Sequence, residues 1–136
     1  MIHPQYLLDT SAVVDLMRHP DGIVARSMDK AGGVVKCAIS DLTLFELYSG
    51  AYSSQDVEKN LVAVERLTKW LAVIPSACGY REAAIRKVEL RRQGLLIEDL
   101  DILIGCTAIA SDRILVTANV KHFERLKGIQ LENWQR

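Results

Sequence analysis

The sequence has no excess of either charge, few aromatic residues and little proline. Basic residues number 17, acidic residues also number 17, aromatic residues make up 6% of the chain, and there are three prolines. The zero net charge argues against a protein that coats nucleic acid or a membrane surface through bulk basicity. It does not exclude a nucleic-acid partner, because a local rim of basic residues can act over about 8–10 Å at moderate salt. With 49% hydrophobic residues, the 136-residue chain excludes a disordered protein and predicts one domain over residues 1–136.

Cysteine is scarce and widely spaced. Cys37, Cys78 and Cys106 have the spacing of neither a disulfide framework nor a zinc site. All three lie in apolar stretches, which predicts buried, reduced thiols. The longest strongly apolar run, residues 102–110, is far shorter than the about 18–20 residues that span a bilayer, and residues 1–8 lack the pattern of a secretory signal. We therefore expect a cytoplasmic location and no membrane contact.

Short apolar runs alternate with longer amphipathic segments along the chain. The pattern predicts strands at residues 6–8, 34–39, 72–74, 114–117 and 129–131. It predicts helices at residues 12–18, 23–30, 42–52, 56–71, 77–93 and 101–111, and a helical turn at 121–126. Strands linked by helical crossovers form a mainly parallel sheet that is covered on both faces, so the fold class is α/β. Ligands of such folds bind outside the carboxyl ends of the strands.

Oxygen-bearing side chains gather where the predicted strands end. Asp9 follows the first strand, and Thr117 and Asn119 follow the fourth. Glu46 lies one turn into the helix after the second strand, and Asp101 begins the apolar helix before the fourth. Because carboxyl ends of parallel strands share one edge of the sheet, these side chains are candidates for one pocket.

Each acidic residue also has a purely structural interpretation. Asp9 could cap the following helix, but Thr10 and Ser11 are equally good caps and would leave Asp9 free for chemistry. Glu46 lies in an apolar segment, so we expect it to be partly buried and to need a polar partner. Asp99 is expected to cap the apolar helix and is a second-choice site residue.

Carboxylates without histidine or cysteine partners favour a hard cation, Mg²⁺ or Mn²⁺. Glycine-rich phosphate loops of the GxxxxGK[ST] and GxGxxG types are absent from the sequence. The combination points to metal-assisted hydrolysis of a phosphate ester. An aspartyl-nucleophile phosphatase is an alternative, although such an enzyme usually has an acid two residues after the nucleophile and Ser11 stands there.

Four segments in order resemble the motifs of one family. They are Leu-Leu-Asp-Thr-Ser-Ala at residues 7–12, the segment 39–50 with Glu-Leu-Tyr-Ser-Gly, Leu-Asp-Ile-Leu-Ile-Gly-Cys-Thr-Ala at 100–108, and Leu-Val-Thr-Ala-Asn-Val-Lys-His-Phe at 115–123. The sequence is similar in these segments to the PIN-domain ribonucleases, specifically the VapC toxins of toxin–antitoxin pairs. The resemblance covers nearly the whole chain.

The resemblance implies a three-layer α/β/α PIN fold and a Mg²⁺-dependent endoribonuclease acting on RNA. It also implies a homodimer and a cognate VapB-type antitoxin whose tail blocks the acidic pocket. Asn119 falls where many members of the family have a fourth aspartate, and this difference removes one negative charge. A catalytically inactive PIN-fold binding module is the remaining alternative. By position, the catalytic set is Asp9, Glu46, Asp101 and Asn119, with Ser11 and Thr117 orienting the carboxylates or a metal-bound water.

The metal site is predicted at Asp9, Asp101 and Glu46. Asp9 and Asp101 are the main contacts to Mg²⁺, directly or through water, and Mn²⁺ could replace the ion; Glu46 orients or deprotonates the attacking water. Crowded carboxylates repel one another, so we expect at least one raised pKa. Substrate contacts are predicted from the basic turn after Asn119, where a solvated charged turn is the alternative. The residues of that turn are Lys121, His122 and Arg125.

Overall fold

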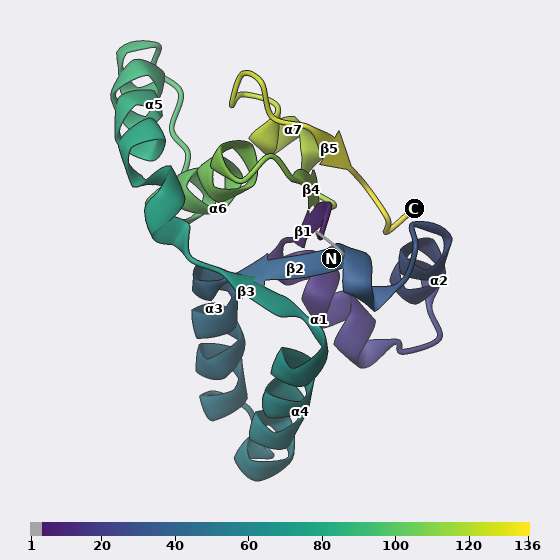
Figure 1. The fold of residues 1–136 in the computed structure, drawn as a ribbon. Coiled ribbons are helices and arrows are strands. Elements are labelled where there is room, and N and C mark those ends of the chain that lie inside the picture. The colour runs from purple at the N-terminus through teal and green to yellow at the C-terminus, as the bar shows by residue number, and fades with distance from the viewer. Residues whose placement is uncertain (1–3) are drawn as a thin grey trace.

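A parallel β-sheet forms the centre of the computed structural model, which describes residues 4–136 (Figure 1). Within these residues the sheet has five strands in the order β3-β2-β1-β4-β5, and every neighbouring pair is parallel. The strands are β1 (Tyr6–Leu8), β2 (Cys37–Ser40), β3 (Ala72–Ile74), β4 (Ile114–Val116) and β5 (Leu131–Glu132).

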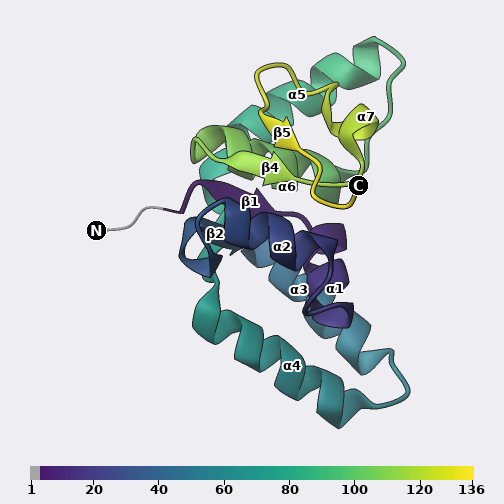
Figure 2. The ribbon, with the colours of Figure 1, turned by 90° about the vertical axis from the view of Figure 1, so that its right-hand side faces the viewer.

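Helices cover both faces of the sheet, as predicted (Figures 1 and 2). One layer contains α1 (Thr10–Arg18), α2 (Ile23–Lys30), α3 (Asp41–Tyr52) and α4 (Val57–Trp70). The other contains α5 (Tyr80–Arg92), α6 (Asp99–Ala110) and the short α7 (Val120–Phe123). The three-layer α/β/α arrangement is therefore confirmed. None of the helices in residues 4–136 is long and apolar enough to cross a membrane.

The strand side chains alternate between two buried cores. Leu7 and Leu115 pack with the layer of α5, α6 and α7, whereas Leu8 and Val116 pack with the layer of α1 to α4. All four side chains have no exposed surface. Burial on both faces is why these strands are apolar at consecutive positions instead of every second one.

The strand order reverses beside β1, and this places the site. The chain moves outward from β1 to β2 and β3, then crosses to β4 on the other side of β1. Leu8 of β1 pairs in register with Val116 of β4, so Asp9 and Thr117 leave the sheet side by side. A crevice opens at such a reversal because the connecting helices lie on opposite faces.

Two predicted strands begin more than one residue away from the observed ones. The segment predicted to be a strand over residues 34–39 begins with a 3₁₀ turn, η1 (Val34–Lys36), and only then enters β2. Gly33 has φ of +92°, and its carbonyl accepts the Lys36 amide, so the chain turns before it can pair. The last strand lies at Leu131–Glu132 instead of 129–131, since the Ile129 amide closes a turn on the Leu126 carbonyl.

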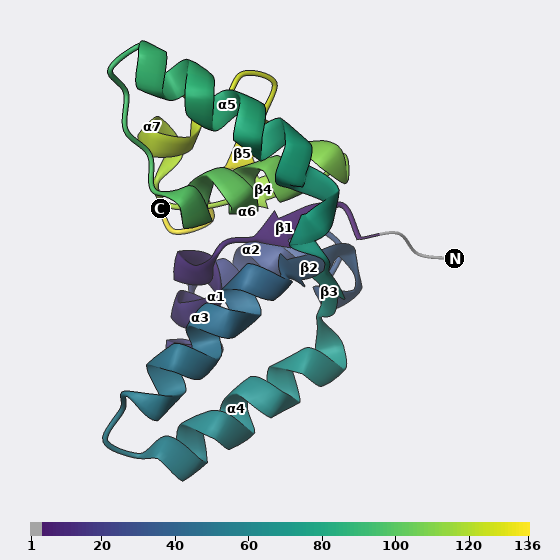
Figure 3. The same ribbon diagram turned by 90° about the vertical axis from the view of Figure 1, so that its left-hand side faces the viewer.

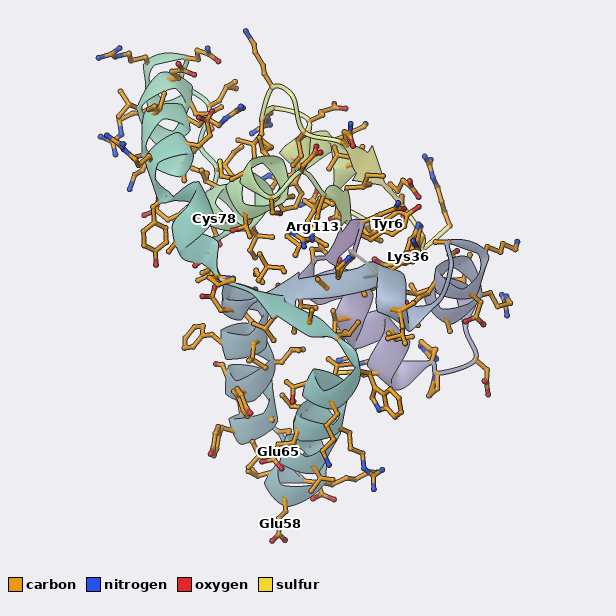
Figure 4. All side chains as sticks on the ribbon, viewed as in Figure 1. Tyr6, Lys36, Glu58, Glu65, Cys78 and Arg113 are labelled. Carbon is orange, nitrogen blue, oxygen red and sulfur yellow. The ribbon has the colours of Figure 1, made fainter. Side chains whose placement is uncertain are left out.

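The prediction that all three cysteines are buried is wrong for Cys78. Cys37 and Cys106 are buried in the two cores, but Cys78 is exposed on the 3₁₀ turn η2 (Ser76–Gly79) between β3 and α5 (Figure 4). Ser76 and Gly79 occupy the inward positions of that turn and leave Cys78 on its outer side. Burial raises the pKa of the Cys37 thiol to about 12 and that of Cys106 to about 11.

We expect Cys78 to be the fast-reacting thiol of the native protein, because the thiolate is the reactive form and the other two thiols are buried and protonated. Titration with Ellman's reagent at pH 8 measures this directly. Cys78→Ser should remove the fast phase, and in denaturant it should still show the thiols of Cys37 and Cys106. A fast phase that persists in native Cys78→Ser would contradict the burial of the other two.

Candidate active site

Asp9 is a buried carboxylate at the junction of β1 and α1. Its side chain is 7% exposed, and Oδ1 accepts hydrogen bonds from the Ala12 amide at 2.9 Å and the Ser11 hydroxyl at 2.8 Å. Asp9 is therefore the N-cap of α1, and the prediction that Thr10 or Ser11 would serve instead is wrong. The reason lies in the backbone: Asp9 is still extended, with φ −75° and ψ 173°, whereas Thr10 is already helical.

The pKa of Asp9 is raised, mainly because the carboxyl group is buried. Hydrogen bonds from Thr117, Ala12 and Ser11 oppose the shift, and the negative charge of Asp101 adds to it. The expected direction is confirmed, but repulsion between carboxylates is a minor cause and desolvation is the main one. The effect of Asp101 also shows that these two acids, 92 positions apart in the chain, share one electrostatic environment.

Glu46 is partly buried on α3 and has the polar partner that its apolar surroundings require. The Thr10 hydroxyl donates to Glu46 Oε1 at 2.5 Å and lies 3.3 Å from the Thr43 hydroxyl. Thr43 is fully buried, so Thr10 is held between the two residues of α3. Thr10 thus joins the acid on α3 to the helix that begins at Asp9. The sequence predicts Thr10 only as a helix cap. Its hydroxyl next to Asp9 is the one feature of the sequence that could have indicated a role in the site.

Asp101 lies in the first turn of α6 and faces α7. Its Oδ2 is 3.1 Å from Nε2 of His122, and the Asp101 side chain is about one-third exposed. The His122 ring packs edge-on against Phe123, with ring centroids 5.5 Å apart. His122, predicted to contact RNA, therefore contacts a carboxylate of the acidic set in this structure.

The other predicted residues are divided between the site and its rim. Thr117 is fully buried and bonds to Asp9, and its hydroxyl accepts the backbone amide of Asn119 at 3.0 Å. Asn119 precedes α7 and is exposed next to this site. Lys121 and Arg125 are exposed on and just after α7.

Asp99 is not the cap of α6. Glu98 occupies the N-cap position without a side-chain cap bond, and Asp99 is the first helical residue. The Asp99 carboxylate is 65% exposed and accepts from Lys87 of α5 at 2.9 Å. Asp99 lies two positions before Asp101, and residues two apart on a helix point in different directions. Asp99 therefore faces α5, whereas Asp101 faces α7.

The acids surround the crevice without converging on one point. Among residues 4–136, no three acidic, histidine or cysteine side chains lie close enough to hold an ion by themselves. The charge of Asp101 acts on Asp9, and Glu46 is linked to the start of α1 through Thr10. This donor set still fits Mg²⁺, because Mg²⁺ keeps several waters and binds through one or two carboxylates.

Comparison with known proteins assigns the chain to a family. Residues 6–129 match the family described as PIN domain. The chain belongs to this family. Two of its relatives are ribonucleases of Haemophilus influenzae: Ribonuclease VapC1 of strain R2866, 30% identical over 132 residues, and Ribonuclease VapC2 of strain Rd, 34% identical over 134 residues. The tRNA(fMet)-specific endonuclease VapC of Shigella flexneri is 32% identical over 132 residues. Each alignment covers 96% of this PIN-domain chain and 98% of the relative.

Solved structures agree with this assignment. The DNA-bound VapBC structure from Salmonella typhimurium contains a chain that matches with a TM-score of 0.89 and 27% identity, over 97% of this chain and 99% of that one. VapBC2 from Rickettsia felis, bound to a promoter DNA fragment, matches with a TM-score of 0.85 and 30% identity, over 95% and 98%. The resemblance to PIN-domain VapC proteins predicted from the four motifs is confirmed. Nucleases of this family are metal-dependent in general.

Proposed function

We propose that this chain, as one PIN domain over residues 1–136, is a metal-dependent endoribonuclease and the toxin of a VapBC-type pair. One observation supports this most strongly: the buried carboxyl group of Asp9 lies where the sheet order reverses, its pKa is raised mainly by burial, and the negative charge of Asp101 adds to the shift. A structural acid would not need a second acid beside it, because like charges disfavour burial. The names of its relatives, Ribonuclease VapC and tRNA(fMet)-specific endonuclease VapC, support RNA as the substrate.

In this proposal Asp9 and Asp101 hold Mg²⁺, or Mn²⁺ in its place. When bound, the ion neutralises charge on the phosphate and lowers the pKa of water. Thr10 occupies Oε1 of Glu46, which leaves Oε2 to accept a proton from the attacking water. His122 restrains the Asp101 carboxylate from the side of α7. Asn119 provides an amide where many members have an acid, which favours a single ion.

The partners proposed are an RNA substrate, a VapB-type antitoxin and a second copy of the chain in a homodimer. The VapBC structures from Salmonella typhimurium and Rickettsia felis support the antitoxin. We propose the cytoplasm as the location, since the substrate RNA is there.

Incubation of the purified protein with total RNA tests the activity. We expect cleavage with Mg²⁺ or Mn²⁺ and none with EDTA. Asp101→Asn should reduce the rate at least about 100-fold, since loss of a metal contact removes several kcal/mol of transition-state stabilisation. Mapping of the new RNA ends identifies the cleaved site.

Glu58→Gln is the matched control, because Glu58 is an exposed acid at the far end of α4 (Figure 4). It should cleave at the wild-type rate. Full activity of Asp101→Asn in a preparation free of contaminating nuclease would refute the proposed metal site. Absence of cleavage in the wild type would favour the inactive binding module, and a trapped phosphoaspartate would favour the phosphatase.

A further inference from the structure

A cavity on the side of α7 has several polar residues in its walls, one of which is the predicted site residue Asn119. It has a volume of about 480 Å³, and its walls come from the segment after β4 and from the C-terminal segment. Figures 2 and 3 both show the C-terminal segment between α7 and the beginning of α1. The polar residues that line the cavity are Asn119, Lys121, Glu124, Asn133 and Arg136.

The C-terminal wall is anchored to the body of the protein. Trp134 is 6% exposed and belongs to the core on the side of α1 to α4. It packs against Tyr6 with ring centroids 5.1 Å apart, and its Nε1 donates to Glu132 at 3.0 Å. The Gln135 amide donates to Asn133 Oδ1 at 2.8 Å. This buried tryptophan anchors the segment from which Asn133 and Arg136 line the cavity.

Two contacts link the segments that line the cavity to the acidic site. The side-chain amide oxygen of Gln135 lies 3.4 Å from the Ser11 hydroxyl, which donates to Asp9 at 2.8 Å. On the opposite wall, the Asn119 backbone amide donates to Thr117, which bonds to Asp9. Both segments that line the cavity therefore also border the acidic site.

We propose that the cavity is a subsite for the nucleotide next to the cleaved bond, a role that rests on the proposed ribonuclease function. Lys121 and Arg136 bind the phosphate of that nucleotide, since both are exposed cations on opposite walls and outnumber Glu124. The amides of Asn119 and Asn133 bind the sugar or a base edge. Phosphate binding and metal binding are thereby separated, because the cations of the subsite bind a phosphate and the neighbouring carboxylates hold the metal.

RNA binding without cleavage tests the subsite. In the Asp101→Asn background, a fluorescein-labelled single-stranded RNA of mixed sequence is titrated by anisotropy in EDTA. Lys121→Gln with Arg136→Gln should weaken binding about 10-fold at 0.15 M salt and lower the slope of log Kd against log[salt] by about 0.7, the value for one phosphate contact on a single strand. In the metal-loaded wild-type background the same pair should raise KM about 10-fold with kcat within about 2-fold.

Lys127→Gln with Arg92→Gln is the charge-matched control, because both cations are exposed outside the cavity. It should bind RNA almost as the parent does. Equal losses in the two double variants would overturn the subsite and leave only a general charge effect. If the Lys121→Gln, Arg136→Gln double variant kept the parent's RNA affinity but bound the antitoxin more weakly, the subsite would also be overturned. Absence of cleavage by the wild type would refute the ribonuclease function separately, since the binding comparison does not use cleavage.

Discussion

Replacing Asp9 by asparagine is expected to abolish RNA cleavage and, at the same time, to stabilise the metal-free protein at neutral pH. Cleavage should fall at least about 100-fold, because an amide is a poor ligand for Mg²⁺ and carries no charge. The fold should survive, because asparagine caps a helix as well as aspartate does. Its side-chain oxygen can still accept from the Ala12 amide and the Ser11 hydroxyl.

The gain in stability follows from the direction of the Asp9 pKa shift. Burial raises this pKa in the folded state, so the folded protein holds the Asp9 proton more tightly than the unfolded chain does. The stabilising effect of that proton is complete below the ordinary aspartate pKa and is lost as the pH rises through the folded-state value. Above that value an ionised carboxylate stays buried at a cost in free energy. Asparagine has no such cost, so its advantage should grow from acid to neutral pH and then level off.

Urea unfolding in EDTA between pH 3 and 8 measures this difference. Asp9→Ala provides a contrast, because it removes the cap and should lose about 1 kcal/mol relative to Asp9→Asn. Glu58→Gln, an exposed change of the same type, should follow the wild type across the pH range. If Asp9→Asn unfolded more easily than the wild type at pH 7, the assignment of Asp9 as a destabilising catalytic acid would be wrong.

Much of this fold could be predicted because its determinants are local. Apolar runs bounded by polar residues indicate strands, and alternation with helices requires a parallel sheet. Asp9 and Thr117 could be placed at one edge of the sheet for the same reason, since both follow strands directly. What local pattern could not supply was the choice among candidate caps: Asp9, Thr10 and Ser11 are chemically equivalent caps, and the backbone at the end of β1 decides among them.

The partners of the acidic side chains could not be predicted, because they come from distant parts of the chain. Thr10 reaches Glu46 across 36 positions, and His122 reaches Asp101 across 21. Neither pair has a spacing that any helix or strand repeat would produce. The C-terminal wall of the proposed subsite is a similar case, since it depends on where the buried Trp134 docks. Sequence patterns therefore locate the acids, and tertiary packing determines what each acid contacts.

Gly79→Ala is expected to be the most damaging small substitution for stability. A Cβ at this position would lie 2.8 Å from the carbonyl carbon and oxygen of Cys106 and 2.9 Å from the Thr107 nitrogen. These are backbone atoms in the middle of α6, so no side chain can rotate away. Gly79 has φ of −104°, which any residue can adopt, so space and not backbone conformation is what requires glycine here. We expect a loss of about 3 kcal/mol, the upper range for overpacking a close contact.

Gly50→Ala is the matched control for this prediction. Gly50 lies on α3, and a Cβ there would meet no heavy atom within 4 Å. Alanine is the better helix former by about 1 kcal/mol, so this variant should be at least as stable as the wild type. Thermal unfolding should separate the two variants by about 10 °C or more for a chain of this length. A Gly79→Ala midpoint close to that of Gly50→Ala would mean that η2 and α6 can move apart. Their close approach would then not be essential to the position of α6 and of Asp101 in its first turn.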